Sequence, residues 1–188
     1  MYDHYDGLIF DMDGTLVNSE PAHRQAWTQV LEKHRLTFSF EQMIALNGAP
    51  SWKIAHQIII ANDVTLDSSQ LAAEKEQFLD KILLSNSALL PLISVARHYH
   101  GRLPMAVGTG SSHAMADRLL THHGVRHLFE VLVGADDVQH HKPDPQTFLE
   151  CARLMGVTPQ KCVVFEDADF GLRAAKAAGM DAVDVRTH

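Results

Sequence analysis

Hydrophobic residues are arranged along the chain in short continuous runs, separated by longer segments with a helical repeat of apolar positions. The runs cover residues 7–10, 105–107, 131–133, 162–165 and 182–185. Unbroken apolar runs of this length are typical of strands that are buried on both faces. Between the later runs lie helical patterns at residues 114–123, 145–155 and 170–178. Strands that alternate with helices predict an α/β fold with a doubly wound parallel sheet.

One long segment interrupts this alternation, because it contains several helical patterns and no convincing strand. Its first helix follows Asn18 and Ser19, whose side chains are well suited to an N-cap. We therefore expect a helical cap subdomain at residues 18–87. The remaining residues, 1–17 and 88–188, are then expected to form the catalytic core.

Composition and charge narrow the kind of partner. The chain has 188 residues, 46% of them hydrophobic, and a formal net charge of -7 from 16 Lys and Arg against 23 Asp and Glu. It has no basic stripe to neutralise a nucleic-acid backbone, and its longest apolar segment, residues 88–96, is too short to cross a bilayer. Neither of its two cysteines, Cys151 and Cys162, lies in a C-x-x-C pair, and its 13 histidines are scattered. We expect a cytoplasmic monomer with a small-molecule substrate, and neither a nucleic-acid nor a membrane partner.

Polar residues with catalytic chemistry recur where the predicted strands end. They are Asp11 and Asp13 after the first strand, Thr109, Gly110 and Ser111 after the second, Lys142 beyond the third, and Glu166 and Asp167 after the fourth. Ligands bind beyond the carboxyl ends of the strands in an open parallel sheet. Several carboxylates at such a site would repel one another unless a cation lay between them, and oxygen-only ligands suit Mg²⁺. The sequence thus predicts a magnesium site at this edge.

This set of residues is suited to phosphoryl transfer, which needs an in-line nucleophile, neutralised phosphate oxygens and a proton for the leaving alcohol. Asp11 is the candidate nucleophile and would form an aspartyl-phosphate intermediate. Asp13 is placed to protonate the leaving oxygen and then to deprotonate the attacking water. Thr109 and nearby backbone N–H groups would hold phosphate oxygens, and Lys142 would bridge the phosphate and Asp11.

Simpler interpretations of the same residues remain open at this point. Asp11 and Asp13 are also common turn residues, Lys142 could be a solvated loop lysine, and Glu166 and Asp167 could cap the helix that follows them. A receiver-like phospho-acceptor module would also place such residues at parallel-strand ends. An acid-base group two positions after the nucleophile argues against it, because that group would speed the loss of a signalling phosphate.

Four motifs occur in order at the strand ends: Asp11-Met12-Asp13-Gly14-Thr15, Thr109, Lys142-Pro143 and Glu166-Asp167. In these motifs the chain resembles the haloacid dehalogenase superfamily of phosphatases. That resemblance implies a Rossmann-like core with a helical cap that closes over the substrate. It also implies Mg²⁺ bound by Asp11, by the backbone carbonyl of Asp13 and by Asp167, with Glu166 as a further ligand.

Two cap segments, residues 20–27 and 46–53, resemble the β-phosphoglucomutase-like branch of this superfamily, and the whole chain resembles its bacterial fructose-1-phosphate phosphatases. The resemblance implies a small sugar phosphate as substrate, with His23, Asn47 and Lys53 as candidate contacts. Ser51 stands where the mutases have an arginine that grips a second phosphate. This difference favours hydrolysis of a monophosphate, with β-phosphoglucomutase activity as the alternative.

Overall fold

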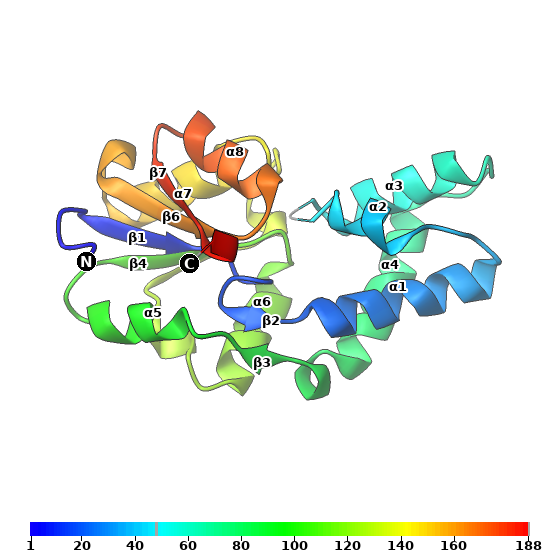
Figure 1. Ribbon diagram of the computed structural model, residues 1–188, viewed down its shortest axis with the longest axis horizontal. Helices are drawn as coiled ribbons and strands as arrows, with labels where there is room; N and C mark the ends of the chain where they lie inside the picture. The colour runs from blue at the N-terminus through cyan, green and yellow to red at the C-terminus, as the bar shows by residue number, and fades with distance from the viewer. Residues whose placement is uncertain (48, 188) are drawn as a thin grey trace.

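The computed structural model describes residues 1–47 and 49–187 and contains the predicted parallel sheet at the centre of the larger part of the molecule (Figure 1). The strands run in the order β5-β4-β1-β6-β7, and every neighbouring pair is parallel. Their bounds are β1 (Gly7–Phe10), β4 (Met105–Gly108), β5 (Val131–Val133), β6 (Cys162–Glu166) and β7 (Asp181–Asp184). Each strand lies within two residues of its predicted position, and the α/β fold is confirmed.

Helices cover both faces of this sheet. The bounds of the four are α5 (Ile93–Tyr99), α6 (His113–His122), α7 (Gln146–Met155) and α8 (Asp169–Ala177). Leu8 and Phe10 of β1 face one layer and pack with Ala96 and Leu119, whereas Ile9 faces the opposite layer. Both faces of β1 are therefore buried, as its unbroken apolar run predicts. Helix α5 was not among the predicted elements.

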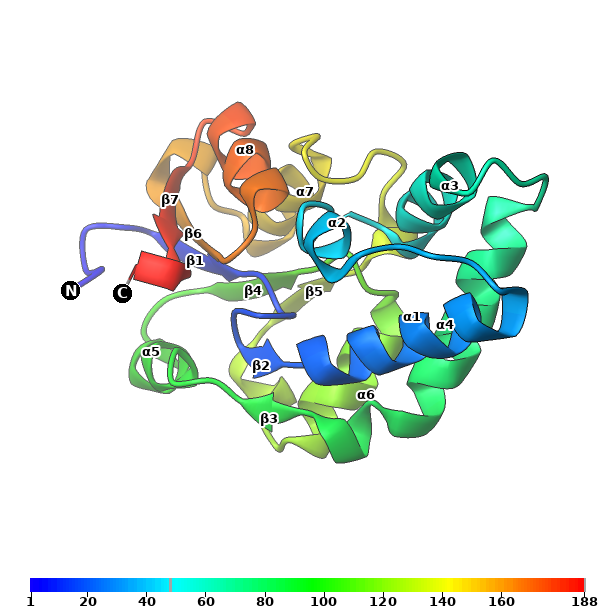
Figure 2. The ribbon, with the colours of Figure 1, turned by 45° about the vertical axis from the view of Figure 1, so that its right-hand side comes forward.

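A second group of helices lies beside the core (Figure 1). Its members are α1 (Glu20–His34), α2 (Phe40–Ile44), α3 (Ser51–Ala61) and α4 (Ser68–Ile82). Helix α4 packs against both α1 and α3 (Figure 2). Trp27 and Ile58 belong to a hydrophobic cluster that these helices share. We propose that residues 18–87 form the cap unit, with residues 1–17 and 88–188 as the core.

The chain enters and leaves this helical group through a short antiparallel ladder that the sequence did not predict. Strand β2 (Val17–Asn18) pairs with β3 (Ala88–Leu89), so the two crossings lie side by side. Two-residue strands carry no periodicity that a sequence pattern could reveal. Short 3₁₀ turns complete the chain at η1 (Leu84–Asn86), η2 (Arg126–Leu128), η3 (Ala135–Asp137), η4 (Pro159–Lys161) and η5 (Val185–Thr187).

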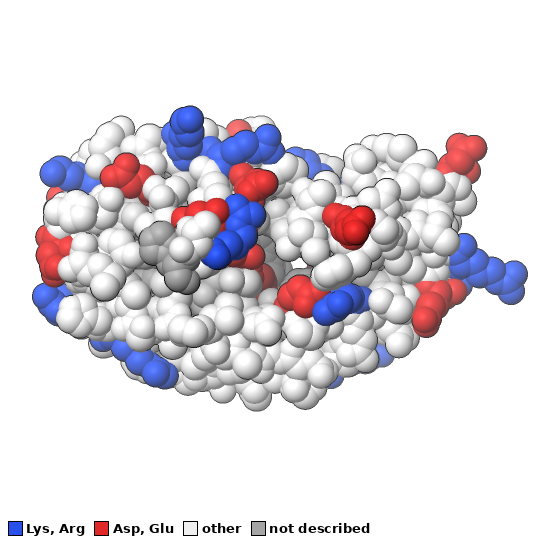
Figure 3. All heavy atoms as spheres, viewed as in Figure 1, with Lys and Arg blue, Asp and Glu red and all other residues white. Residues whose placement is uncertain are grey.

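The surface carries charges of both signs. On the face shown in Figure 3, basic and acidic side chains are interspersed. Within the described residues, no helix is long and apolar enough to cross a membrane. Gly48, in the cap segment at residues 46–53, and the C-terminal His188 lie outside the described residues.

Candidate active site

A buried ion-pair cluster lies at the carboxyl edge of the sheet. Asp11 directly follows β1 and Glu166 ends β6, and these two strands are hydrogen-bonded neighbours. Lys142, from the loop beyond β5, donates to Asp11 Oδ1 at 2.6 Å and to Glu166 Oε1 at 2.8 Å. Burial lowers the pKa of Lys142, but the two carboxylates more than offset this and raise it above its ordinary value. Lys142 is a charged group of the site and not a solvated loop lysine.

Glu166 has a second role at the start of α8. Its Oε2 accepts a hydrogen bond from the N–H of Ala168, the residue before the helix, at 2.7 Å, in addition to the contact of Oε1 with Lys142. Within the part of the chain that the structure describes, no side chain caps the first turn of α8, so the simple helix-capping interpretation does not account for Glu166 and Asp167. Gly171 makes room for this carboxylate, because a Cβ atom there would overlap Glu166 Oε1. A glycine inside a helix weakens it and implies a packing reason, which here is the close approach of Glu166.

Asp167 completes a group of three carboxylates with Asp11 and Glu166, whose ligand atoms lie within 4.8 Å of one another. Thr15 Oγ1 donates to Asp167 Oδ1 at 3.2 Å. A Cβ on Gly14 would overlap the Asp167 carboxylate, and the φ of 84° at Gly14 also favours glycine.

The electrostatics of these carboxylates favour a cation. Burial raises the pKa of Asp11 well above its ordinary value; Lys142 opposes this, and Glu166 adds to it. Burial and the charge of Glu166 raise the pKa of Asp167 to about 6. One ammonium therefore does not balance three carboxylates, and their oxygen-only donor set fits a hard divalent ion such as Mg²⁺.

Asp13 lies in a different environment, among hydroxyl groups. Ser19 Oγ donates to its Oδ1 at 2.5 Å, and Ser111 Oγ donates to its Oδ2 at 2.9 Å. His23 Nε2 lies 3.5 Å from Oδ1, an ion-pair distance and not a well-formed hydrogen bond. Burial raises the pKa of Asp13, but His23 and the two serines outweigh it, so the pKa is lowered and the group is a carboxylate.

Two residues of this edge make side-chain contacts that the sequence did not predict. Ser19 occupies the N-cap of α1, but its side chain makes no cap hydrogen bond and binds Asp13 instead. Thr109 is buried, and its Oγ1 accepts from the Ser111 N–H at 3.1 Å and lies 3.4 Å from Asp13 Oδ2. Its hydroxyl thus lies among protein groups, whereas Gly110 and Ser111 line the open cavity.

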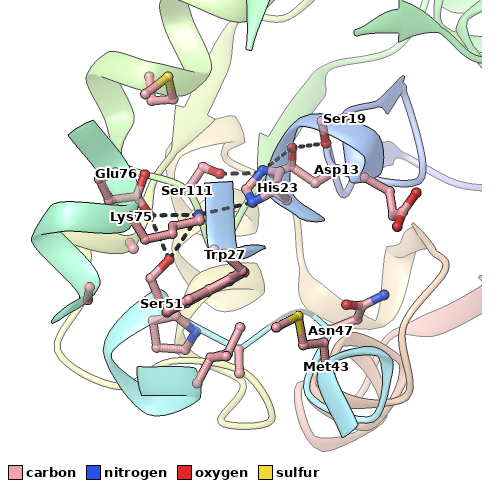
Figure 4. Close-up of a pocket in the computed structure, with 18 of the residues that line it drawn as sticks. Asp13, Ser19, His23, Trp27, Met43, Asn47, Ser51, Lys75, Glu76 and Ser111 are labelled. Carbon is pink, nitrogen blue, oxygen red and sulfur yellow. Dashed lines mark hydrogen bonds and ion pairs between the residues drawn. The ribbon is translucent and has the colours of Figure 1, made fainter. Parts of the chain in front are cut away.

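A cavity of about 920 Å³ extends from this edge to the helices of the cap (Figure 4). Of the three predicted cap contacts, His23 and Asn47 line it. Lys53 is not among the described residues that line the cavity, and its ammonium lies 5.9 Å from the ring centroid of Trp52. The corresponding interpretation of Lys53 as a substrate contact therefore has no support from the cavity.

Comparison with known proteins identifies the family. A family model described as haloacid dehalogenase-like hydrolase matches residues 5–179. The chain belongs to this family. The resemblance read from the four motifs is thereby confirmed, and as a hydrolase the protein is an enzyme, so the signalling-module alternative is not retained.

Relatives within the family are similar over nearly the whole chain. Fructose-1-phosphate phosphatase YqaB of Escherichia coli (strain K12) is 57% identical over 186 residues, which cover 99% of each chain. Validoxylamine A 7'-phosphate phosphatase of Streptomyces hygroscopicus subsp. limoneus is 31% identical and covers 97% of this chain and 86% of its own length. A crystal structure of β-phosphoglucomutase from Clostridium difficile aligns with a TM-score of 0.83 at 23% identity, over 95% of this chain and 83% of that chain, which shows the shared fold alone.

The cap wall of the cavity holds a cluster that the family motifs do not cover. Lys75 Nζ lies 3.0 Å from His23 Nδ1, 3.2 Å from Ser51 Oγ and 3.0 Å from Glu76 Oε1 (Figure 4). Lys75 is buried, although it is a charged residue of a cap helix. This burial results from the packing of α4 against α1 and α3, which a local helical pattern does not show.

Proposed function

We propose that this enzyme is a Mg²⁺-dependent phosphatase that hydrolyses monoesters of small sugars, with fructose 1-phosphate as the preferred substrate. The observation that carries the proposal is the pair of unlike carboxylates on one side of the cavity. Asp11 is held by Lys142 within the acidic cluster, and Asp13 is held by hydroxyls two residues away. The relative named as a fructose-1-phosphate phosphatase supports the substrate class. A cytoplasmic location and a monomeric state stay predictions.

Four groups would hold the metal: the carboxylates of Asp11, Glu166 and Asp167 and the backbone carbonyl of Asp13. The acidic cluster supports this assignment, since its carboxyl groups carry more negative charge than Lys142 balances. When bound, Mg²⁺ neutralises charge on the phosphate and on these carboxylates.

Asp11 is proposed to attack phosphorus through Oδ2. Lys142 engages Oδ1, and among the described residues no hydrogen-bond donor engages Oδ2. The new Oδ2–P bond replaces the bond from phosphorus to the ester oxygen, and Asp13 gives that oxygen its proton. Gly110 and Ser111 lie at the cavity side of the same edge, where they would orient the phosphate oxygens.

Asp13 is proposed to reverse its role in the second step. It takes a proton from water as the water oxygen attacks the aspartyl phosphate, which releases inorganic phosphate and restores Asp11. The carboxylate form favoured by Ser19 and Ser111 is the form that this step needs. In the first step a phosphate dianion beside Asp13 would raise its pKa and favour the protonated form.

A phosphate-release assay over sugar phosphates, with and without Mg²⁺, tests the proposal. We expect release from fructose 1-phosphate that chelation of the metal abolishes. No release from any sugar phosphate in Mg²⁺ would contradict it. Incubation with β-glucose 1-phosphate and catalytic glucose 1,6-bisphosphate tests the mutase alternative: abundant glucose 6-phosphate with little free phosphate would replace the phosphatase assignment.

A further inference from the structure

On the cap side of the cavity, the carboxylate of Glu76 is partly exposed, and the ammonium of Lys75 is buried next to it. Glu76 Oε1 accepts from Ser51 Oγ at 2.6 Å and from Lys75 Nζ at 3.0 Å. The side chain of Lys75 is 1% exposed, whereas that of Glu76 is 44% exposed. A molecule in the cavity therefore meets the anion of this pair and the serine hydroxyl, while the ammonium is covered.

This cluster lies on the side of the cavity that the leaving group must occupy. Lys75 also contacts His23 Nδ1 at 3.0 Å, and His23 Nε2 lies 3.5 Å from Asp13 Oδ1. Figure 4 shows this sequence of contacts running from α4 across α1 to Asp13. Because Asp13 is the proposed proton donor to the leaving oxygen, the sugar attached to that oxygen would extend into the cap side of the cavity, which Ser51 and Glu76 line.

The cap half of the cavity offers no excess of positive charge. The charged cap residues that line it are three cations and three carboxylates: Arg24, Lys75, Lys81, Glu20, Glu76 and Asp80. Arg24 is paired with Glu20 at 3.1 Å, Lys75 with Glu76, and Asp80 with Arg118, whereas within the described residues no carboxylate pairs with Lys81. Beside Glu76 a neutral sugar can donate hydroxyl hydrogens, but a second phosphate there would meet a carboxylate whose paired ammonium is covered.

We propose that Glu76 is a specificity-determining residue that accepts hydroxyl groups of a neutral sugar and excludes leaving groups with a second anionic group. The proposal rests on the phosphatase function above and narrows its substrates to monoesters of neutral sugars, against sugar bisphosphates and phosphorylated sugar acids. Burial raises the pKa of Glu76, but Lys75 and Ser51 outweigh it and lower the pKa, so the residue is ionised during turnover.

The test compares kcat/KM for fructose 1-phosphate and fructose 1,6-bisphosphate in the wild type, in Glu76→Gln and in the control Glu74→Gln. Glu74 lies on the same helix but pairs with Lys33 at 2.8 Å and His34 at 2.9 Å, away from the cavity lining. We expect Glu76→Gln to raise the relative kcat/KM of the bisphosphate by about tenfold, because one unit of repulsion is removed and Lys75 is uncovered. Glu74→Gln leaves this ratio unchanged. An unchanged ratio in a folded, active Glu76→Gln overturns the proposal.

Two further measurements keep this test separate from the phosphatase proposal. Calorimetry measures the affinities for fructose 1-phosphate and fructose 1,6-bisphosphate without turnover in Asp11→Asn and in the double variant that also carries Glu76→Gln. We expect the double variant to bind the bisphosphate relatively more tightly, by the same factor as in the kinetic test. If the wild type releases no phosphate but this shift is present, the function fails and the role of Glu76 stands. High salt should reduce the wild-type preference for fructose 1-phosphate over fructose 1,6-bisphosphate, because salt screens the repulsion between Glu76 and the second phosphate. A preference that does not depend on salt overturns the proposal, even if Glu76→Gln does not fold.

Discussion

The cavity has two walls that differ in structure: the core wall, formed at the carboxyl edge of the sheet, and the cap wall, formed by the cap helices. On the core wall, Asp11 and Glu166 sit at the ends of neighbouring strands and are almost fully buried around Lys142. On the cap wall, Glu76 and Ser51 come from two helices and are partly exposed. The pairing of β1 with β6 sets the relative positions of Asp11 and Glu166. The contact between Glu76 and Ser51 depends instead on how the cap helices pack. A core wall of this kind can keep one reaction while the cap wall changes the substrate.

The two walls also differ in their balance of charged side chains. Burial, together with an excess of carboxylates over cations in the core cluster, raises the pKa of Asp11 and of Asp167, and a bound metal would relieve this. The charged cap residues that line the cavity are balanced in number. Positive charge for a phosphate is therefore expected at one end of the cavity, where Lys142 and the metal would lie.

The largest effect is expected from Asp11→Asn, which removes the proposed nucleophile while keeping its shape. We expect kcat to fall by at least about a thousandfold. Because burial and neighbouring carboxylates raise the pKa of Asp11, the ionised group is unfavourable there, and we expect the free energy of unfolding to stay equal or to increase. Phosphate release and thermal melts measure the two quantities. Near-normal turnover in Mg²⁺ would refute the assignment of Asp11.

Gly171→Ala tests how closely α8 packs against the Glu166 carboxylate of the core wall. Helix propensity alone would stabilise α8 by about 1 kcal/mol. We expect destabilisation instead, by about 1–3 kcal/mol, with weaker Mg²⁺ binding, because the new Cβ overlaps Glu166 Oε1. Calorimetric melts and metal titration measure these effects.

A double-mutant cycle with Glu166→Ala isolates the cause of that effect. If the overlap with the Glu166 side chain is responsible, Gly171→Ala should cost little when that side chain is already short. An equal cost in both backgrounds would place the strain elsewhere in α8.

The core wall was predictable from sequence because strand ends fix where its residues meet. Asp11 and Glu166 each follow an apolar run, and parallel strands bring such positions to one edge. The role of Gly171 was not predictable, because a glycine gives no sign of which side chain approaches it. Its position inside a helical pattern was the one available signal.

The cap wall was less predictable, because its contacts join helices whose relative positions no local pattern sets. His23 and Asn47 line the cavity, whereas Lys53 is not among the described residues that line it. The roles of all three as substrate contacts stay predictions. Lys75 and Glu76 are neighbours on α4, and the packing of this helix buries the first and leaves the second partly exposed at the cavity. Tertiary packing decides such roles.

A smaller effect is expected from His23→Ala, which breaks the contact between the two walls at Asp13. The matched control is His34→Ala, because His34 lies on the same helix but pairs with Glu74. We expect kcat to fall roughly tenfold with little change in KM, a part of what acid-base catalysis contributes. His23 helps to lower the pKa of Asp13, so its loss should move the acid limb of the kcat profile to higher pH. An unchanged limb would show that His23 does not act through Asp13.

The smallest effect concerns protons and Mg²⁺ at the core wall. Burial and Glu166 raise the pKa of Asp167 to about 6, so the metal-free protein takes up a proton as the pH falls through this value. Mg²⁺ must displace that proton, and its affinity should fall about tenfold for each pH unit below 6, equivalent to about 1.4 kcal/mol. The rise in Tm caused by Mg²⁺ should therefore shrink by about 3–6 °C for each pH unit below 6.

Thr15→Val offers a directional check on that pH dependence. The Thr15 hydroxyl donates to Asp167 and lowers its pKa, so its removal should raise the pKa further and move the whole transition to higher pH. Thermal melts with and without Mg²⁺ across the acidic range measure both midpoints. A Mg²⁺-induced shift in Tm that is independent of pH in both proteins would mean that Asp167 does not bind the metal, and the charge contrast between the two walls would then rest on Asp11 and Glu166 alone.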